Sequence, residues 1–302
     1  MSRQMVSHDA DGLIYEFTPG LEPVYTAENG ESLTVETIDS IGGAVQEDAD
    51  IVDEVPEEVN GATGPIAVSG AEPGDVLKVE IEDVRVNEDR GRVLTIPDFG
   101  LLHESDEIEE PRTRVTPVED DVIRFGDIEV PIQPCIGTIG VAPADKSYTT
   151  LVPHDHGGNL DTTDMTGGTT AYFPVFQEGG LLAMGDSKAA MADGEMCGTG
   201  AEIGTDIDIT VTVLSNPAFE LSRPVVETAD AWKTIASAET LEAACQLANE
   251  DMTALLAKEH GVDETDAHLF SSLVGGLEIS QVVDPLVTVR NAVPKEYLSS
   301  PF

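Results

Sequence analysis

The chain has 302 residues, and 40% of them are apolar, which is enough to build a substantial hydrophobic core. Its 58 Asp and Glu residues outnumber its 15 Lys and Arg residues, so the formal net charge is -43 at pH 7. A negative charge of this size, spread along the whole sequence, repels nucleic acids and anionic membrane surfaces, so we predict neither as a partner.

The excess of carboxylates also indicates the solvent in which the chain works. At low ionic strength their mutual repulsion would cost a compact fold several kcal/mol, whereas about 1 M salt shortens the Debye length to roughly 3 Å. We therefore predict a protein of a highly saline cytoplasm, from an extreme halophile, with an ordinary acidic protein as the alternative. Most carboxylates are then solvated surface groups, so an acid becomes a candidate site residue only through its neighbours.

The cysteine pattern and the first residues predict a cytoplasmic protein. Cys135, Cys197 and Cys245 form no CxxC pair and are odd in number, which argues against a disulfide framework and against a thiolate zinc site. The opening stretch MSRQMVSHDADG lacks the apolar core of a signal peptide, and no stretch approaches the roughly 20 apolar residues of a membrane-spanning helix. We expect neither secretion nor membrane insertion.

The first half of the chain reads as β-structure. The stretches SLTVETID (32–39) and DVLKVEIEDVRV (75–86) alternate apolar and polar residues, as strands with one buried face do. VIRFGDIEVPIQ (122–133) predicts a hairpin that turns at Gly126 and Asp127, because both residues are common in turns. We therefore assign residues 1–150 to a mainly β part.

Helical periodicity occurs only in the last third. From Glu239 to His260 apolar residues recur at steps of three and four, and Gly261 is a typical C-terminal cap. A second helix is expected to begin near Asp263, so we place the helical segment at about 229–275.

Strands are predicted on both sides of this helical segment. DIDITVTVL (206–214) and the stretch 277–294 read as strands before and after it. The sequence shows no internal repeat and no low-complexity linker. We therefore predict a single unit, 1–302, whose second part, 151–302, bears the functional site.

Two glycine-rich stretches concentrate the polar side chains of chemical interest. They are HDHGGNLDTTDMTGG (154–168) and GDSKAAMADGE (185–195). Glycine lets backbones approach closely, and convergent carboxylates and imidazoles are what a metal site or a polar hydrolytic pocket requires. No common catalytic or phosphate-binding motif is present. Three interpretations remain open: a catalytic cluster, surface loops rich in turn residues, and a structural cation site.

Six stretches resemble the acetamidase/formamidase family of amide hydrolases, in the family's order and over nearly the full chain. They are TGPIAVSGAEPGDVLKVEI (63–81), PCIGTIGVAPA (134–144), HGGNLDTTDM (156–165), YFPVFQEGGLLAMGD (172–186), ADGEMCGTGAEI (192–203) and LEISQVVDP (277–285). The resemblance implies hydrolysis of a small linear amide, formamide or acetamide, to the carboxylate and ammonia. It also implies a mostly β (α+β) fold with a sandwich-like β body and smaller α/β portions, to which the periodicity adds the C-terminal helical segment.

The resemblance also suggests roles for the polar residues, because some relatives are zinc-dependent amidases. A divalent metal, Zn²⁺ in the first place, would activate a water molecule and polarise the amide carbonyl. Glu195 would act as general base and acid, and Asn159 would orient the substrate. The predicted site residues are Glu195, Asp193 and Lys188 for catalysis, Asp161, Asp186, His156 and His154 for the metal, and Asn159, Gly157 and Gly158 for the substrate. Glu202 also matches the family's polar pattern, without an assigned role.

Lys188 departs from the family's pattern, which has His at this place, and Ala192 replaces a Gly. A protonated ammonium repels a divalent cation, whereas an imidazole binds one. Three accounts of Lys188 are open: a neutral amine that serves as ligand or base, an ammonium that pairs with a carboxylate beside a retained metal, and an ammonium that replaces the metal. The third account implies a catalytically altered or inactive member that binds a small metabolite.

The remaining expectations concern a rival nucleophile and assembly. A thiolate at Cys197 is the alternative mechanism, but its acidic surroundings disfavour the charged sulfur. The expected partners are a small amide substrate and further copies of the chain in a homo-oligomer.

Overall fold

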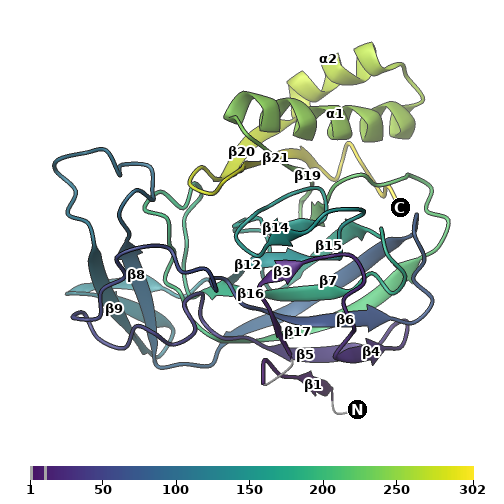
Figure 1. The fold of residues 1–302 in the computed structure, drawn as a ribbon. Coiled ribbons are helices and arrows are strands. Elements are labelled where there is room, and N and C mark those ends of the chain that lie inside the picture. The colour runs from purple at the N-terminus through teal and green to yellow at the C-terminus, as the bar shows by residue number, and fades with distance from the viewer. Residues whose placement is uncertain (1–2, 10–11) are drawn as a thin grey trace.

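The computed structural model describes residues 3–9 and 12–302 and is mostly β, with two helices near the C-terminal end (Figure 1). This confirms the predicted fold class. Residues 1–2 and 10–11, part of the stretch in which the sequence predicts no leader, lie outside the described residues. Among the described residues, no helix is both long enough and apolar enough to cross a bilayer.

The largest sheet combines strands from both halves of the chain. Its pairs are antiparallel apart from β1 and β5, which run parallel. The predicted strand at 206–214 lies near its centre as β17, where buried and half-buried residues alternate strictly. The strand order is β1 (Gln4–Val6), β5 (Ser32–Glu36), β17 (Thr205–Leu214), β7 (Val76–Val86), β15 (Thr169–Pro174), β18 (Val225–Glu227), β19 (Ala231–Ala238), β21 (Val287–Pro294) and β20 (Gly276–Gln281).

A second sheet packs against the first and bears the candidate site. The two sheets share one apolar core, to which Ile136 and Met184 contribute from the second sheet and Val79 and Ile209 from the first. This arrangement agrees with the expected sandwich-like body. The strand order is β14 (Gly157–Asn159), β12 (Cys135–Gly140), β16 (Leu182–Lys188), β6 (Ala62–Val68) and β2 (Leu13–Ile14), with β4 (Tyr25–Ala27) beside β6. Nearby, β3 (Glu16–Phe17) pairs with β13 (Tyr148–Thr149).

A small sheet lies to one side of the body, at the left of Figure 1. The predicted hairpin is confirmed, because β10 and β11 pair across Gly126, whose φ of 63° is a backbone angle that favours glycine. The strand order is β8 (Arg90–Thr95), β9 (Arg112–Glu119), β10 (Val122–Phe125) and β11 (Ile128–Pro131).

The two helices lie where the 3.6-residue periodicity placed them. α1 spans Leu241–His260 and ends at Gly261 in the left-handed region, and α2 spans Glu264–Val274 with Asp263 as its N-cap. The start of the helical segment at about 229 is wrong, because Ala231–Ala238 forms strand β19. This strand pairs with β21 along its whole length, and α1 covers it, so burial on both faces hides the alternation that marks a strand.

Candidate active site

Five acidic side chains and one lysine from four segments converge on one buried place between the second sheet and the β20–β21 turn. Glycine-rich segments outside β16 supply three of the acids, β16 supplies Asp186 together with Lys188, and a turn more than 80 residues further along the chain supplies the last acid. Each of the six residues is at most 9% exposed. They are Asp161, Asp186, Lys188, Glu195, Glu202 and Asp284. The two glycine-rich stretches therefore meet, as the catalytic-cluster interpretation predicts.

The Lys188 ammonium lies between the carboxylates. Its Nζ is 2.5 Å from Asp161 Oδ1 and 2.6 Å from Asp186 Oδ2, and it lies 3.5 Å from Glu195 Oε1 and 3.9 Å from Glu202 Oε2. A side chain at residue 137 would occupy the same space, because a Cβ there would collide with Lys188 Nζ and with the oxygens of Asp161 and Asp186. Gly137 therefore makes room for the ion pairs.

The carboxylates keep Lys188 charged. Burial alone lowers the pKa of Lys188, but the surrounding carboxylates, Asp161 and Asp186 foremost, raise this pKa well above the usual value. A lysine that holds its proton cannot serve as a metal ligand or as a base. Of the three accounts of Lys188, the geometry thus favours the two in which it is an ammonium.

The acids themselves hold protons more strongly than usual. Burial, opposed by Lys188, raises the pKa of Asp186 to about 6. Burial is also the main reason why the pKa values of Glu195, Glu202 and Asp284 lie well above those of ordinary carboxyl groups, and neighbouring carboxylates raise them further. One ammonium cannot balance so many carboxylates, so this site either retains protons or attracts a further cation.

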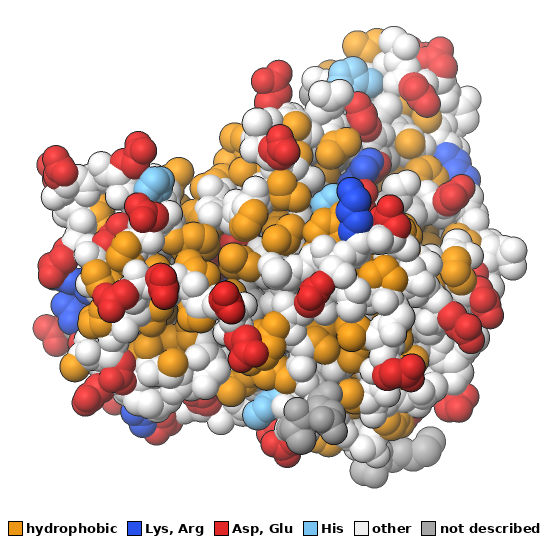
Figure 2. Space-filling view, viewed as in Figure 1, with side chains coloured by type: hydrophobic (Ala, Val, Ile, Leu, Met, Phe, Trp, Pro, Cys, Tyr) orange, Lys and Arg blue, Asp and Glu red, His pale blue; other side chains and the backbone are white. Residues whose placement is uncertain are grey.

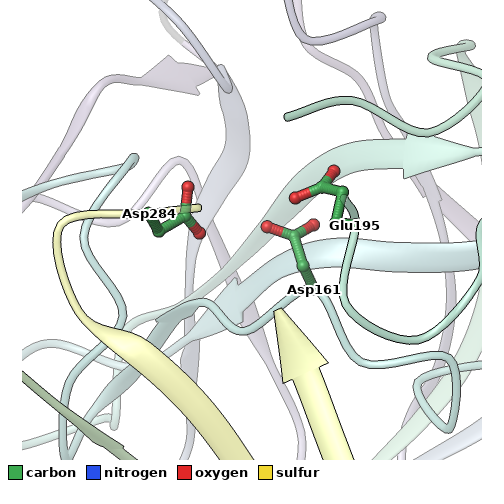
Figure 3. Close-up of side chains that lie close together, drawn as sticks. All are labelled: Asp161, Glu195 and Asp284. Carbon is green, nitrogen blue, oxygen red and sulfur yellow. The ribbon is translucent and has the colours of Figure 1, made fainter. Parts of the chain in front are cut away.

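Three of the acids could hold a metal. Asp161, Glu195 and Asp284 each direct a carboxylate oxygen to a place where all three oxygens lie within 4.8 Å of one another (Figure 3). Asp161 Oδ2 is buried and has no hydrogen-bond partner, so it is free to bind a cation. An all-oxygen donor set fits hard divalent cations best and is also accepted by Zn²⁺. The residues present therefore fit a divalent metal, whose identity they do not determine.

The two predicted histidine ligands lie in an aromatic group instead. The ring of His154 stacks on Tyr148 at 4.5 Å, and the ring of His156 lies 5.1 Å from Tyr148 and 5.0 Å from Phe17. Burial, and then His154, lowers the pKa of His156 to about 3. The chain turns between His154 and Gly157, which directs both imidazoles toward β3 and β13. The geometry thus gives no support to their role as ligands.

The residues predicted to orient the substrate have structural partners. Asn159 borders the cavity, but its Nδ2 donates to Asp284 Oδ2 at 2.9 Å and its Oδ1 accepts from Thr138 at 2.6 Å. It therefore positions Asp284. The N–H of Gly157 donates to the carbonyl of His154, and Gly157 and Gly158 lie in strand β14, where a Cβ would collide with neighbouring backbone.

Asp193, the other predicted catalytic acid, lies outside this cluster. Its side chain is 48% exposed and forms an ion pair of 2.6 Å with Arg290 Nη2. Cys197 is also outside, and its Sγ contacts the carbonyl of Thr199 at 3.3 Å.

A small cavity of about 30 Å³ adjoins the acids, which admits only a very small molecule. Its polar wall contains Asp186, Lys188, Glu195, Glu202 and Asp284. Apolar side chains also line it, namely those of Ile41, Val55, Val59, Leu94, Ile96, Phe99 and Leu151.

Sequence reasoning missed Asp284 and left Glu202 without a role. Asp284 lies in LEISQVVDP, one of the stretches that carry the resemblance, which was the available signal. Its carboxylate reaches the site because Gln281 Oε1 accepts from the N–H groups of Val283 and Asp284 and so shapes the turn.

The sequence and the fold are those of a known class of proteins. The sequence matches the profile of the Acetamidase/Formamidase family over residues 2–148 and 144–234. A formamidase of Methylophilus methylotrophus is 28% identical in an alignment that covers 73% of this chain and 70% of that protein. The chain therefore belongs to the acetamidase/formamidase family.

Solved structures agree over the whole length. An acetamidase from Bacillus halodurans superimposes with a TM-score of 0.92 at 35% identity, covering 97% of this chain and 98% of that chain. A predicted acetamidase/formamidase from Thermoanaerobacter tengcongensis gives a TM-score of 0.93 at 38% identity, covering 99% of both chains.

Proposed function

We propose that this chain hydrolyses a small linear amide, of the formamide or acetamide type, to the carboxylate and ammonia. We further propose that a divalent cation, held by Asp161, Glu195 and Asp284, assists the reaction. The observation that carries the proposal is the convergence of these three buried carboxyl groups beside a cavity of very small volume. Membership of a family that contains formamidases and acetamidases supports the same reaction class.

Amide hydrolysis moves a proton from the attacking water to the departing nitrogen. The water oxygen forms a bond to the carbonyl carbon, the carbon–nitrogen bond breaks, and the nitrogen leaves as ammonia. Glu195 suits this transfer because its carboxyl group borders the cavity, where it can accept a proton from water and then donate it to the departing nitrogen. A bound divalent cation would add Lewis acidity at the amide carbonyl and a lowered pKa of a water molecule.

The other residues hold the reacting groups in place. Lys188 fixes Asp161 and Asp186 and neutralises part of their charge. Asn159 fixes Asp284. The apolar side chains exclude bulk water from the cavity and confine the acyl part of the substrate.

A second function, binding of a small metabolite without turnover, is favoured by one observation. Lys188 Nζ already donates a hydrogen bond to Asp161 Oδ1, so Asp161 can offer a cation only its other oxygen, Oδ2. In that case the ammonium serves as the cation of the site.

Ammonia release separates the two functions. Formamide and acetamide would be supplied in molar salt to wild type, Glu195→Gln and the exposed control Glu178→Gln, each with chelator and then with Mn²⁺ or Zn²⁺. We expect wild type and Glu178→Gln to release ammonia equally and Glu195→Gln to be slower by about 10²–10⁴-fold. No release by wild type with any metal, together with calorimetric binding of acetamide, would establish the second function instead.

Metal affinity tests the carboxylate group independently. Asp284→Asn removes one charged ligand, so we expect the Kd for Mn²⁺, measured by calorimetry, to rise by roughly 10–100-fold or more. The exposed control Asp121→Asn keeps the wild-type Kd. Equal affinity of both variants would place the cation elsewhere.

A further inference from the structure

A buried arginine connects two of the segments that supply the cavity's acids. Arg290, in β21, is 1% exposed. Its Nη1 donates to Asp164 Oδ2 at 2.5 Å and to Thr163 Oγ1 at 3.2 Å, and its Nη2 lies 2.6 Å from Asp193 Oδ2. Thr163 Oγ1 in turn donates to Asp193 Oδ1 at 2.9 Å. A single guanidinium therefore binds both glycine-rich segments.

These contacts lie next to the residues of the proposed metal group. Thr163 and Asp164 lie two and three residues after Asp161, and Asp193 precedes Glu195 by two residues. Asp161 and Glu195 adopt φ angles of 41° and 44°, which are unfavourable for residues other than glycine. Such backbone persists only where surrounding contacts hold it.

The third acid comes from the hairpin that carries Arg290. Asp284 lies in the turn between β20 and β21, and the N–H of Gly194 donates to the carbonyl of Ser280 in β20 at 2.7 Å. The hairpin thus contacts the Glu195 segment through its backbone and through Arg290. The guanidinium lies where the segments of all three carboxylates meet.

We propose that Arg290 is a positioning residue that holds the segments of Asp161 and Glu195 against the β20–β21 hairpin, so that their carboxylates meet Asp284. The planar guanidinium suits this task because its two terminal nitrogens bind two segments at once, whereas a lysine offers one nitrogen. Lys233, which binds Asp164 and Glu278 but makes no contact with Asp193, cannot replace it. The catalytic consequence rests on the proposed hydrolase function; the structural consequence does not.

The test compares Arg290→Gln, Arg290→Lys and Asp193→Asn with a matched control, Arg223→Gln. Arg223 is also partly buried and binds Asp251 through two bonds of 2.7 Å, with its main partner on α1. Hydrogen–deuterium exchange would be measured at residues 161–165 and 193–195, and kcat, KM and Tm would be measured for each variant. Asp193→Asn covers the case in which Arg290→Gln does not fold, because Asp193 is half exposed.

We expect the backbone amides of residues 193–195 to exchange faster than in wild type in both Arg290 variants and in Asp193→Asn. Arg290→Lys should keep at most part of the wild-type protection. Arg290→Gln should lower kcat by about 100-fold and leave KM within a factor of about three, as expected for misplaced reacting groups. Arg223→Gln should change Tm alone. Unchanged exchange at both segments in Arg290→Gln, or full protection and kcat in Arg290→Lys, would overturn the positioning role. Absence of ammonia release by wild type would overturn the proposed function, while the exchange result would still decide the role of Arg290.

Discussion

Two buried cationic centres contact the segments that carry Asp161 and Glu195, and they differ in charge balance. The first centre contains one ammonium, Lys188, which lies within 4 Å of four carboxyl groups, and Asp284 adds a fifth; all five are almost wholly buried. The second centre combines Lys233 and Arg290 with three acids, two of which, Asp193 and Glu278, reach solvent. The charges of this second centre nearly cancel, so it consists of ordinary ion pairs. The unbalanced one must hold protons or a cation, which is the property a hydrolytic site uses.

Removal of the only ammonium from the unbalanced centre should have the largest effect. We expect Lys188→Met to lower the free energy of unfolding by about 3–5 kcal/mol at pH 8, because it leaves buried carboxylates without their partner. The loss should shrink at pH 5, which lies below the raised pKa of Asp186. Urea unfolding at both pH values measures it, and the partly exposed Lys78→Met serves as the control, with a change of at most about 1 kcal/mol. A loss that does not depend on pH would show that packing, and not charge, dominates.

The second largest effect should be a dependence of stability on pH, which comes from the unbalanced centre. The pKa of Asp186 is raised to about 6 and that of Glu195 is raised well above the usual value, so the folded state binds more protons than the unfolded state above about pH 4. These groups therefore make the metal-free protein less stable as pH rises from about 4 through their folded pKa values, by at most about 1.4 kcal/mol per pH unit and group.

Glu195→Gln should flatten this decline, whereas Glu178→Gln should leave it unchanged. Chemical unfolding between pH 4.5 and pH 8 in the presence of chelator (roughly the window set by these groups) measures the slope. Parallel curves for wild type and Glu195→Gln would show that Glu195 is ionised throughout.

Salt should change the repulsion among the surface acids but hardly change the interactions of the buried ones, so its effect on the site is the smallest of those predicted. Raising KCl from about 0.15 M to about 1 M should raise the Tm of wild type, because the many exposed carboxylates visible in Figure 2 repel one another less. The stability difference between wild type and Lys188→Met should change by less than about 0.5 kcal/mol, since buried pairs are poorly screened. A Tm that falls with salt would contradict the predicted saline habitat.

Local sequence patterns predicted much of the fold. The alternation in DIDITVTVL, the periodicity of 239–260 and the cap at Gly261 depend on neighbours in the chain, and each element formed as expected. β19 was missed because α1 covers one of its faces and the main core covers the other, where Ile235 lies, and its own residues do not show this.

The site divides in the same way. Glycine-rich segments indicate a close approach of backbones, and this pattern identified four residues that the structure brings together: Asp161, Asp186, Glu195 and Lys188. Asp284 was missed because a hairpin distant in sequence delivers it. The histidines were expected as ligands because imidazoles in a glycine-rich stretch suit a metal site, whereas the chain turns before Gly157 and directs both rings toward β3 and β13.

The position of Asp284 in the β20–β21 turn has a consequence for biosynthesis. Ribosomes make Asp161, Asp186 and Glu195 long before they make this turn, and the strand with Arg290 emerges later still. The nascent chain therefore carries an incomplete acid cluster until the β20–β21 hairpin docks. Any cation taken up earlier would find at most two of the three carboxylates, so the site matures only after this hairpin has been made.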